Sequence, residues 1–165
     1  MSIVKYGNKI LRMKLKKLIL PDLTIQDKIQ EMAKACDEFH GYAVAANQIG
    51  WDAQVAVIRL NHITGEEKNL VLINPELVGF SEEEVDFNES CLSLPSLYVN
   101  IRRPDEVRVR NYNFEGIEEI VEAKGLLARV IQHEMDHLLG KLIVDYMTPI
   151  QKLMAENKLK RIKRN

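Results

Sequence analysis

The chain has 165 residues, of which 46% are hydrophobic, so it can bury the core of one domain; a disordered chain and a disulfide-stapled miniprotein are excluded. No run of about 18 uncharged apolar residues occurs, so we expect no membrane-spanning helix. The formal net charge of −1 combines +6 in residues 1–20, −12 in residues 21–145 and +5 in residues 146–165. The sequence therefore has an acidic body between two basic ends.

The basic first segment is poor in serine, and its charges interrupt every apolar stretch. We therefore interpret it as the start of the domain and not as a targeting signal. Only two cysteines are present, Cys36 and Cys91. Two cysteines without a signal peptide are typical of a reducing compartment, where a thiol is structural, catalytic or metal-bound. This pattern predicts a cytoplasmic protein.

Helical spacing of apolar residues predicts an amphipathic helix from Ile25 to Phe39, with Cys36 on its buried stripe. We expect Thr24 as its N-cap and Gly41 as its stop. Apolar runs and alternation then predict extended segments at residues 54–60, 70–73, 76–87, 107–110 and 117–121.

After Gly125 the pattern is helical as far as Leu139, and Thr148-Pro149 begins a last helix. The order of one helix, several strands and two helices favours an α+β fold with antiparallel strands over a βαβ repeat. No repeat or linker divides the chain. We predict a single domain, in which residues 1–147 form the main part and residues 148–165 form a basic C-terminal helix.

Residues 133–137 have the pattern H-E-x-x-H. Residues four apart lie on one face of a helix, so His133 and His137 can reach one divalent cation with Glu134 beside them. Leu126 and Val130 continue the same stripe, which places the two imidazoles on the core-facing side. The pattern indicates metal-assisted hydrolysis. The alternative is a helix with two partly buried, hydrogen-bonded histidines.

A metal site needs more than two imidazoles. The long metalloprotease pattern has a third histidine six residues after the second, and Ile143 stands at that position. Glu156 is the acid that a zincin would use, but it lies in a basic segment. Cys91 is the remaining soft ligand, and its alternative role is a buried core thiol. For the lone His40 and His62 we favour surface positions.

Three segments resemble the motifs of the peptide deformylase family. They are residues 41–48 (GYAVAANQ), 89–93 (ESCLS) and 132–138 (QHEMDHL), in the family's order. The resemblance runs over almost the whole chain. It implies antiparallel sheets around a central H-E-x-x-H helix, with an N-terminal and a C-terminal helix, and residues 1–147 as the catalytic part. The implied activity is hydrolysis of the formyl group from the N-terminal formylmethionine of nascent polypeptides.

The resemblance implies Cys91, His133 and His137 as ligands of one divalent metal ion. Fe²⁺ is the expected native ion, with Zn²⁺, Ni²⁺ or Co²⁺ as substitutes. A thiolate ligand suits Fe²⁺ and oxidises readily, which fits an oxygen-sensitive enzyme. Metal-bound water would attack the formyl carbon.

The resemblance also assigns roles around the metal. Glu134 would accept a proton from the water and pass one to the leaving amine. The side-chain amide of Gln48 and the backbone N–H of Leu92 would stabilise the oxyanion. Glu89 and Arg103 would form a pair that steadies the cysteine segment. The alternative for that pair is a surface ion pair worth about 0–1 kcal/mol.

By the same resemblance, the methionine side chain would enter an apolar pocket lined by Tyr42, Phe87, Leu126 and Val130. Backbone near Gly41 and Tyr42 would pair with the extended peptide. Such pairing reads little side-chain identity beyond methionine, which suits an enzyme that acts on many nascent chains.

The sequence departs from the family pattern at three positions. Ala43 replaces a glycine, Asn47 stands where proline or threonine is usual, and Ser90 replaces the glycine before the cysteine. If Ala43 or Ser90 required a positive φ, the strain would cost about 1–2 kcal/mol. Because the ligands, the glutamate and the glutamine are retained, we expect an active enzyme.

Two other functions stay open: a zincin-type metallopeptidase, and a ribosome-associated deformylase-like protein with weak or lost activity. In the C-terminal helix, we expect Ile150, Leu153 and Met154 to dock on the body. Phosphates could then meet its cations, Lys158, Lys160, Arg161, Lys163 and Arg164. The resemblance implies docking at the ribosomal tunnel exit, and the alternative is a solvated helix end.

Overall fold

The computed structural model describes residues 2–164; Met1, Asn165 and the side chain of Arg164, one of the predicted phosphate contacts, lie outside the described part. The described chain forms α1 (Gln26–Glu38), α2 (Gly125–Leu138) and α3 (Pro149–Arg164). Its strands are β1 (Ala43–Ala45), β2 (Val55–Arg59), β3 (Asn69–Ile73), β4 (Glu76–Phe80), β5 (Glu84–Cys91), β6 (Leu94–Pro104), β7 (Glu106–Tyr112) and β8 (Glu118–Lys124). The predicted α+β class is confirmed. No helix within residues 2–164 is long and apolar enough to cross a membrane.

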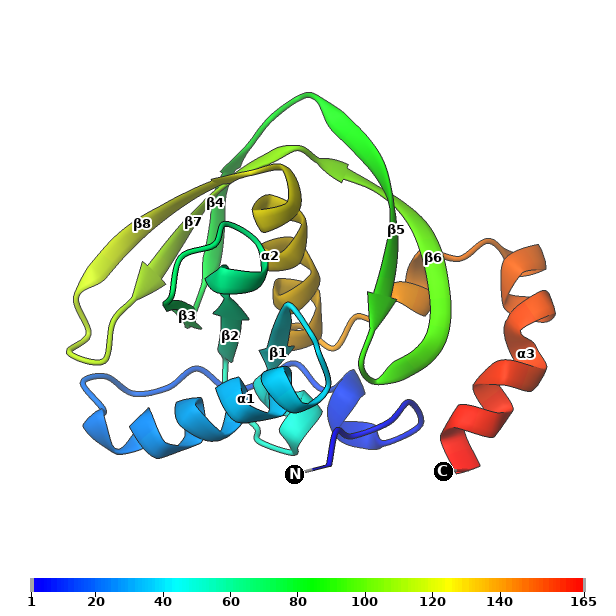
Figure 1. The fold of residues 1–165 in the computed structure, drawn as a ribbon, viewed down its shortest axis with the longest axis horizontal. Coiled ribbons are helices and arrows are strands. Elements are labelled where there is room, and N and C mark those ends of the chain that lie inside the picture. The colour runs from blue at the N-terminus through cyan, green and yellow to red at the C-terminus, as the bar shows by residue number, and fades with distance from the viewer. Residues whose placement is uncertain (1, 165) are drawn as a thin grey trace.

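The strands form three antiparallel sheets, in the orders β1-β2-β3, β4-β7-β8 and β5-β6. Figure 1 shows α2 in the middle of the molecule, with the β4-β7-β8 sheet on one side and the β5-β6 hairpin on the other. Helix α1 crosses below them, and α3 lies beyond the hairpin (Figure 1). The central position of the H-E-x-x-H helix is therefore confirmed.

Most predicted elements are present near their expected bounds. The helix predicted from Ile25 to Phe39 is α1, and Cys36 is completely buried in it. The predicted cap is wrong, because Asp22 Oδ1 accepts the backbone N–H of Thr24 (2.9 Å) and caps a short 3-10 turn before α1. The predicted segments do not include β1 or β6, which is the longest strand of the described chain. The single extended stretch predicted at residues 76–87 is divided between β4 and β5, which lie in different sheets.

Apolar side chains form two cores. One lies between α1, the β1-β2-β3 sheet and α2. The other joins the β5-β6 hairpin to the N-terminal segment, to the turn after α2 and to α3, with Leu11, Leu94, Ile101, Leu142 and Ile143 completely or almost completely buried. The hairpin that carries Cys91 is therefore packed from several sides.

Helix α3 docks with a different face from the one expected. Ala155 and Ile162 are buried in the second core, and Leu159 packs against it. Ile150, Leu153 and Met154 are 71%, 71% and 82% exposed, so the prediction that they dock on the body is wrong. The helical period explains the error, because the buried set at 155, 159 and 162 lies on the opposite side from residues 150, 153 and 154.

The end of α2 lies close to the N-terminal segment. Gly140 has a φ of 75°, and a Cβ at this position would lie 2.6 Å from the carbonyl oxygen of Arg12. The backbone N–H of Leu15 donates to the carbonyl oxygen of Leu138 (2.9 Å). Glycine is needed here because the chain turns in the left-handed region with another backbone against it.

Candidate metal centre and active site

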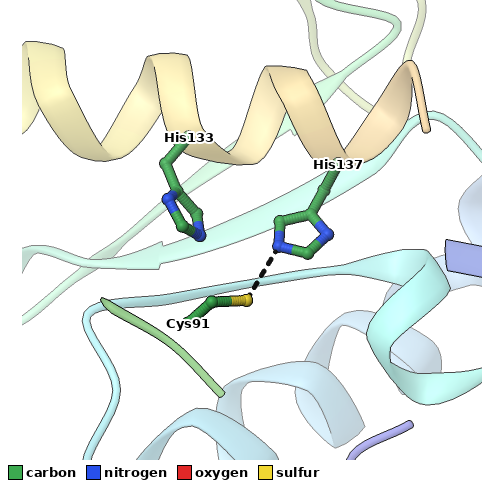
Figure 2. A group of neighbouring side chains, drawn as sticks. All are labelled: Cys91, His133 and His137. Atoms are coloured by element: carbon green, nitrogen blue, oxygen red, sulfur yellow. Dashed lines mark hydrogen bonds between the residues drawn. The ribbon is translucent and has the colours of Figure 1, made fainter. Parts of the chain in front are cut away.

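The histidines of the H-E-x-x-H motif lie on one face of α2, as their spacing predicts. His133 and His137 point toward Cys91 on the facing hairpin (Figure 2), with ring centroids 5.2 Å apart. One ligand atom from each of the three residues lies within 4.8 Å of the other two, and His137 Nε2 is 3.1 Å from Cys91 Sγ. This is the only group of three metal-ligating side chains in residues 2–164 that meets this spacing.

Cys91 is the last residue of β5, directly before the tight turn formed by Leu92 and Ser93. It pairs with Leu94 across the turn, after a register shift between Ser90 and Cys91. Cys91 and Glu89 are both buried, with the exposed Ser90 between them, so the two side chains lie on the same face of β5. The hairpin end thereby brings one sulfur atom to the face of α2 that carries the imidazoles.

The three side chains form a strongly coupled charge cluster. Burial would raise the pKa of Cys91, but the charges and hydrogen bonds of His137 and His133 outweigh it and hold the pKa well below its usual value. Burial would lower the pKa of His133, but hydrogen bonds to Cys91 and Glu89 raise it. A thiolate with two imidazoles is a donor set for Fe²⁺, Zn²⁺ or Co²⁺, so the residues present fit a divalent metal ion.

Glu89 connects the hairpin to the histidine helix. His133 Nδ1 donates to Glu89 Oε2 (2.9 Å), which leaves Nε2 as the ring atom for a metal. Arg103 donates two hydrogen bonds to the same carboxylate, of 2.6 and 3.0 Å, and a third to Asp136 (2.7 Å). Arg129 Nη1 lies 3.2 Å from Glu89 Oε1. Both Glu89 and Arg103 are buried, so the alternative of a surface ion pair is wrong.

Two opposite effects act on the pKa of Glu89. Burial raises it, while the hydrogen bonds from His133 and Arg103 lower it to about 2. The carboxylate therefore stays ionised and can hold the imidazole in one orientation.

Glu134 is 3% exposed and lies beside the ligand cluster on α2. Its Oε2 is a buried atom without a hydrogen-bond partner among the described residues. Burial raises its pKa, which the charges of His133 and His137 partly offset. A buried carboxyl with one unsatisfied oxygen is poised to exchange a proton with a polar group that enters the site.

Several side chains of this site line a cavity of about 490 Å³. The lining includes Cys91, His133 and Glu134, together with the five predicted substrate contacts, Gly41, Tyr42, Phe87, Leu126 and Val130. Gln48 and Leu92 line it as well. The five predicted substrate contacts therefore lie on the wall of one cavity, beside Cys91 and His133.

Gln48 is held from both ends of its side-chain amide. Its Oε1 accepts the backbone N–H of Ala45 (2.9 Å), so its NH₂ group points to Ser93 Oγ (3.2 Å) and Cys91 Sγ (3.6 Å). The amide orientation is therefore fixed, and its N–H donors face Cys91 and Ser93.

Asn47 has a role that the motif comparison missed. It is completely buried, and its Nδ2 donates to the carbonyl oxygen of His137 (2.7 Å). The same carbonyl also accepts the backbone N–H of Gly140 (3.1 Å), so Asn47 adds a second bond that holds the last turn of α2, which carries His137. Tyr146 was also missed: its hydroxyl donates to Asp136 (2.7 Å) beside Arg103. Neither residue has a spacing signal in the sequence.

The departures from the family motif cause no backbone strain. The non-glycine residues with positive φ in the described chain are His40, Asn74 and Ser96. Ala43 and Ser90 are not among them; both lie in regular strands. The strain considered for these two substitutions is therefore absent.

The sequence model of the polypeptide deformylase family matches residues 1–153. The chain belongs to this family. It is 41% identical to the peptide deformylase of Elusimicrobium minutum over 170 aligned residues, which cover 99% of this chain and 96% of that protein. The fold is also that of solved deformylases. Peptide deformylase 1B of Arabidopsis thaliana has a TM-score of 0.91 at 32% identity, covering 99% of this chain and 91% of that one. The deformylase of Legionella pneumophila has a TM-score of 0.89 at 34% identity, covering 99% and 95%.

Membership settles the class of reaction. Peptide deformylases are metal-dependent hydrolases that remove the N-formyl group from nascent peptides, and this chain has the family's fold throughout. The zincin alternative has no support, because Glu156 lies on α3 and pairs with Lys160 (2.6 Å). Nothing favours the alternative of a deformylase-like protein with lost activity.

Proposed function

We propose that the cavity beside α2 is the deformylase active site, with Cys91, His133 and His137 as the metal ligands. The observation that carries this proposal is the meeting of their three ligand atoms within 4.8 Å beside the unsatisfied carboxyl oxygen of Glu134. A bound divalent ion would supply Lewis acidity and lower the pKa of water at the site. Fe²⁺ is the proposed native ion because a thiolate ligand suits it, with Zn²⁺, Ni²⁺ or Co²⁺ as substitutes.

Side chains and backbone groups of the protein perform the proton transfer, the oxyanion stabilisation and the orientation of His133. Glu134 takes a proton from the attacking water and delivers one to the leaving amine, which suits a buried carboxyl with a raised pKa. The Gln48 amide and the backbone N–H of Leu92 donate to the oxygen on which negative charge develops. Loss of one such donor typically lowers kcat by a factor of about 10²–10³. Glu89 and Arg103 keep His133 in the orientation that exposes Nε2.

The substrate enters as an extended chain. Strand β1 is the edge of its sheet, so its outer side pairs with no other strand, and its residue Ala43 lines the cavity. Tyr42 O already accepts the N–H of Arg59 (2.8 Å), and Gly41 O lies 2.9 Å from His62 Nδ1. By strand alternation, the backbone groups of Ala43 face the open edge. The methionine side chain then occupies the apolar part of the cavity lined by Tyr42, Phe87, Leu126 and Val130.

Formate release from formyl-Met-Ala-Ser under anaerobic conditions, with metal analysis of the same sample, tests this proposal. Glu134→Gln should bind metal and lose nearly all turnover. Cys91→Ser should lose both the metal and the activity. Glu156→Gln is the matched control and should retain both, because Glu156 pairs with Lys160 on α3 and is not among the residues that line the cavity beside α2. Metal loss in Glu156→Gln, or full activity in Cys91→Ser, would overturn the ligand set.

We also propose that the basic C-terminal helix docks on the ribosome. The two basic ends of the sequence meet in space at a second cavity of about 490 Å³, between the N-terminal segment and α3. Its charged lining residues are one acid, Glu156, and five cations, Lys9, Arg12, Lys152, Lys160 and Lys163. A concentration of cations favours phosphate groups. Because Ile162 lies in the second core, the same packing supports one domain comprising residues 1–147 and 148–165. We propose a cytoplasmic location, which a substrate on the ribosome and a reduced thiol at the site would both suit.

Charge substitution is the right test for docking, since deletion of α3 would open the second core. Lys152→Gln with Lys163→Gln should weaken co-sedimentation with ribosomes and flatten its salt dependence by about one unit of slope per lost phosphate contact. Lys28→Gln with Lys34→Gln, on α1, is the matched control. Turnover of short formyl peptides should be unchanged in both. Equal ribosome binding by the two pairs would remove the docking proposal.

A further inference from the structure

Arg129 is a buried cation on the face of α2 that carries the metal ligands. It is 6% exposed and lies one helical turn before His133. A guanidinium in such a position is costly unless its donors are satisfied. Its hydrogen-bond partners therefore indicate what it is held there to do.

The partners of Arg129 all belong to the β5-β6 hairpin. Nη1 donates to the carbonyl oxygen of Ile101 on β6 (2.9 Å) and to Glu89 Oε1 on β5 (3.2 Å). Nη2 donates to the carbonyl oxygen of Val85 on β5. One side chain thus ties the histidine helix to both strands of the hairpin at once.

The proposed metal ligands are divided between these same two elements. Cys91 lies at the end of β5, while His133 and His137 lie on α2. The separation between the sulfur and the imidazoles therefore depends on how α2 sits against the hairpin. A planar guanidinium with several fixed acceptors sets that separation more rigidly than apolar contact does.

Arg129 also balances the charge of Glu89, the carboxylate that contacts His133. Glu89 lies between the guanidinium groups of Arg103 and Arg129, and its other oxygen accepts His133 Nδ1. With Asp136 paired to Arg103, the buried group contains two cations and two anions. Glu89 is therefore held at both oxygens, which fixes the ring that it orients.

We propose that Arg129 is a positioning residue for the metal centre: it locks the histidine helix to the cysteine hairpin and, through Glu89, orients His133. The proposal rests on the proposed ligand set. Arg129 also lines the cavity, with its guanidinium 6.0 Å from the centre of the Phe87 ring. Its three hydrogen bonds nevertheless all go to the hairpin, so we assign it to support of the site and not to direct contact with the reacting group.

Metal binding by the full-length protein tests this role. Arg129→Met removes the charge and keeps the bulk of the side chain, and Arg129→Lys keeps the charge but cannot reach all the acceptors. Arg102→Met is the matched control, because Arg102 lies on the same hairpin in an exposed pair with Glu84 (3.0 Å). For each variant, Co²⁺ affinity is measured by chelator competition, and the visible spectrum of the Co²⁺ form reports ligand geometry. Thermal unfolding of the metal-free protein is recorded beside them.

Arg129→Met should bind Co²⁺ about 10–100-fold more weakly, with shifted ligand-field bands. The Co²⁺ affinity of Arg129→Lys should lie between those of Arg129→Met and the wild type. If Arg129→Met does not fold, the affinity and spectrum of Arg129→Lys test the proposal. Arg102→Met should match the wild type. A lower unfolding temperature with unchanged Co²⁺ affinity and spectrum would show a purely structural role and overturn the proposal. If the wild-type Co²⁺ spectrum itself lacked a thiolate charge-transfer band, the ligand set would be wrong instead.

Discussion

The two cysteines have opposite electrostatic surroundings although both are buried. Burial, followed by the charges of Glu134 and Asp37, raises the pKa of Cys36 to about 12, and its Sγ donates to the carbonyl oxygen of Gly41 (3.0 Å). Cys91 faces two imidazoles and the cavity, and its pKa is lowered. Because the thiolate is the reactive form, only Cys91 has the character of a nucleophile or a ligand.

Thiol labelling should separate the two residues. In the metal-free protein, iodoacetamide at pH 7 should modify Cys91 and leave Cys36 intact, because Cys36 remains protonated and outside the cavity. Metal loading should protect Cys91. Peptide mass spectrometry of the labelled protein measures both sites. Equal labelling of the two cysteines in folded protein would contradict this account.

At the scale of elements, α3 is held by a few apolar contacts on one face. Ile162→Ala should lower the free energy of unfolding by about 2–5 kcal/mol, the usual cost of truncating a buried isoleucine, or less if α3 frays locally. Ile150→Ala removes the same atoms from a residue that is 71% exposed, so it should change the free energy of unfolding by no more than about 0.5 kcal/mol. Urea denaturation of both variants measures the difference. Similar losses in the two would mean that α3 docks by another face.

The turn after α2 is tied to the N-terminal segment by Asp145, whose Oδ2 accepts from Arg12 (2.5 Å) and from the backbone N–H of Leu142 (2.9 Å). Burial would raise the pKa of Asp145, but the Arg12 hydrogen bond and the Leu142 N–H lower it below its usual value of 3.8. A carboxyl with a depressed folded-state pKa stabilises the protein above its unfolded pKa and loses that effect as the pH falls through the folded value.

Asp145→Asn should therefore lower the free energy of unfolding by about 0.5–1 kcal/mol at pH 7, a modest figure because the pair is partly exposed. The difference from the wild type should shrink as the pH falls below about 3.8. Urea denaturation at pH 7 and at pH 3 provides the comparison. A difference that did not depend on pH would show that the charge of Asp145 is not involved.

Local patterns predicted what local physics determines. The apolar periods of α1 and α2 predicted the two helices, and the i,i+4 spacing predicted that His133 and His137 lie on one face of α2. Strand β6 was missed although Leu97, Val99 and Ile101 alternate on its buried face; the face continues with Arg103, whose charge predicts an exposed position. Arg129 was missed for the same reason, since a charge on a helix indicates solvent unless its distant partners are known.

At the scale of the whole molecule, the candidate metal site joins parts that are otherwise held by protein contacts alone. A metal ion that binds the folded state and not the unfolded chain stabilises by mass action, by about 2.7 kcal/mol at a free concentration of 100 times Kd. The wild type should therefore unfold at a higher temperature with bound Fe²⁺ or Zn²⁺ than after chelation. Cys91→Ala should show a much smaller rise. Calorimetry with matched metal analysis measures this, and an unchanged midpoint at full occupancy would contradict a ligand set shared between two elements.

The division of the proposed ligands between β5 and α2 also has a consequence for the order of events during synthesis. The thiol of Cys91 is made first, and the imidazoles become available only when α2 has formed and the hairpin has closed on it. A partly made chain that ends before His137 lacks the complete site. At the proposed site, metal uptake would thus be a late step of maturation, and a copy of this protein would have to be complete through His137 before it could act on the start of another chain.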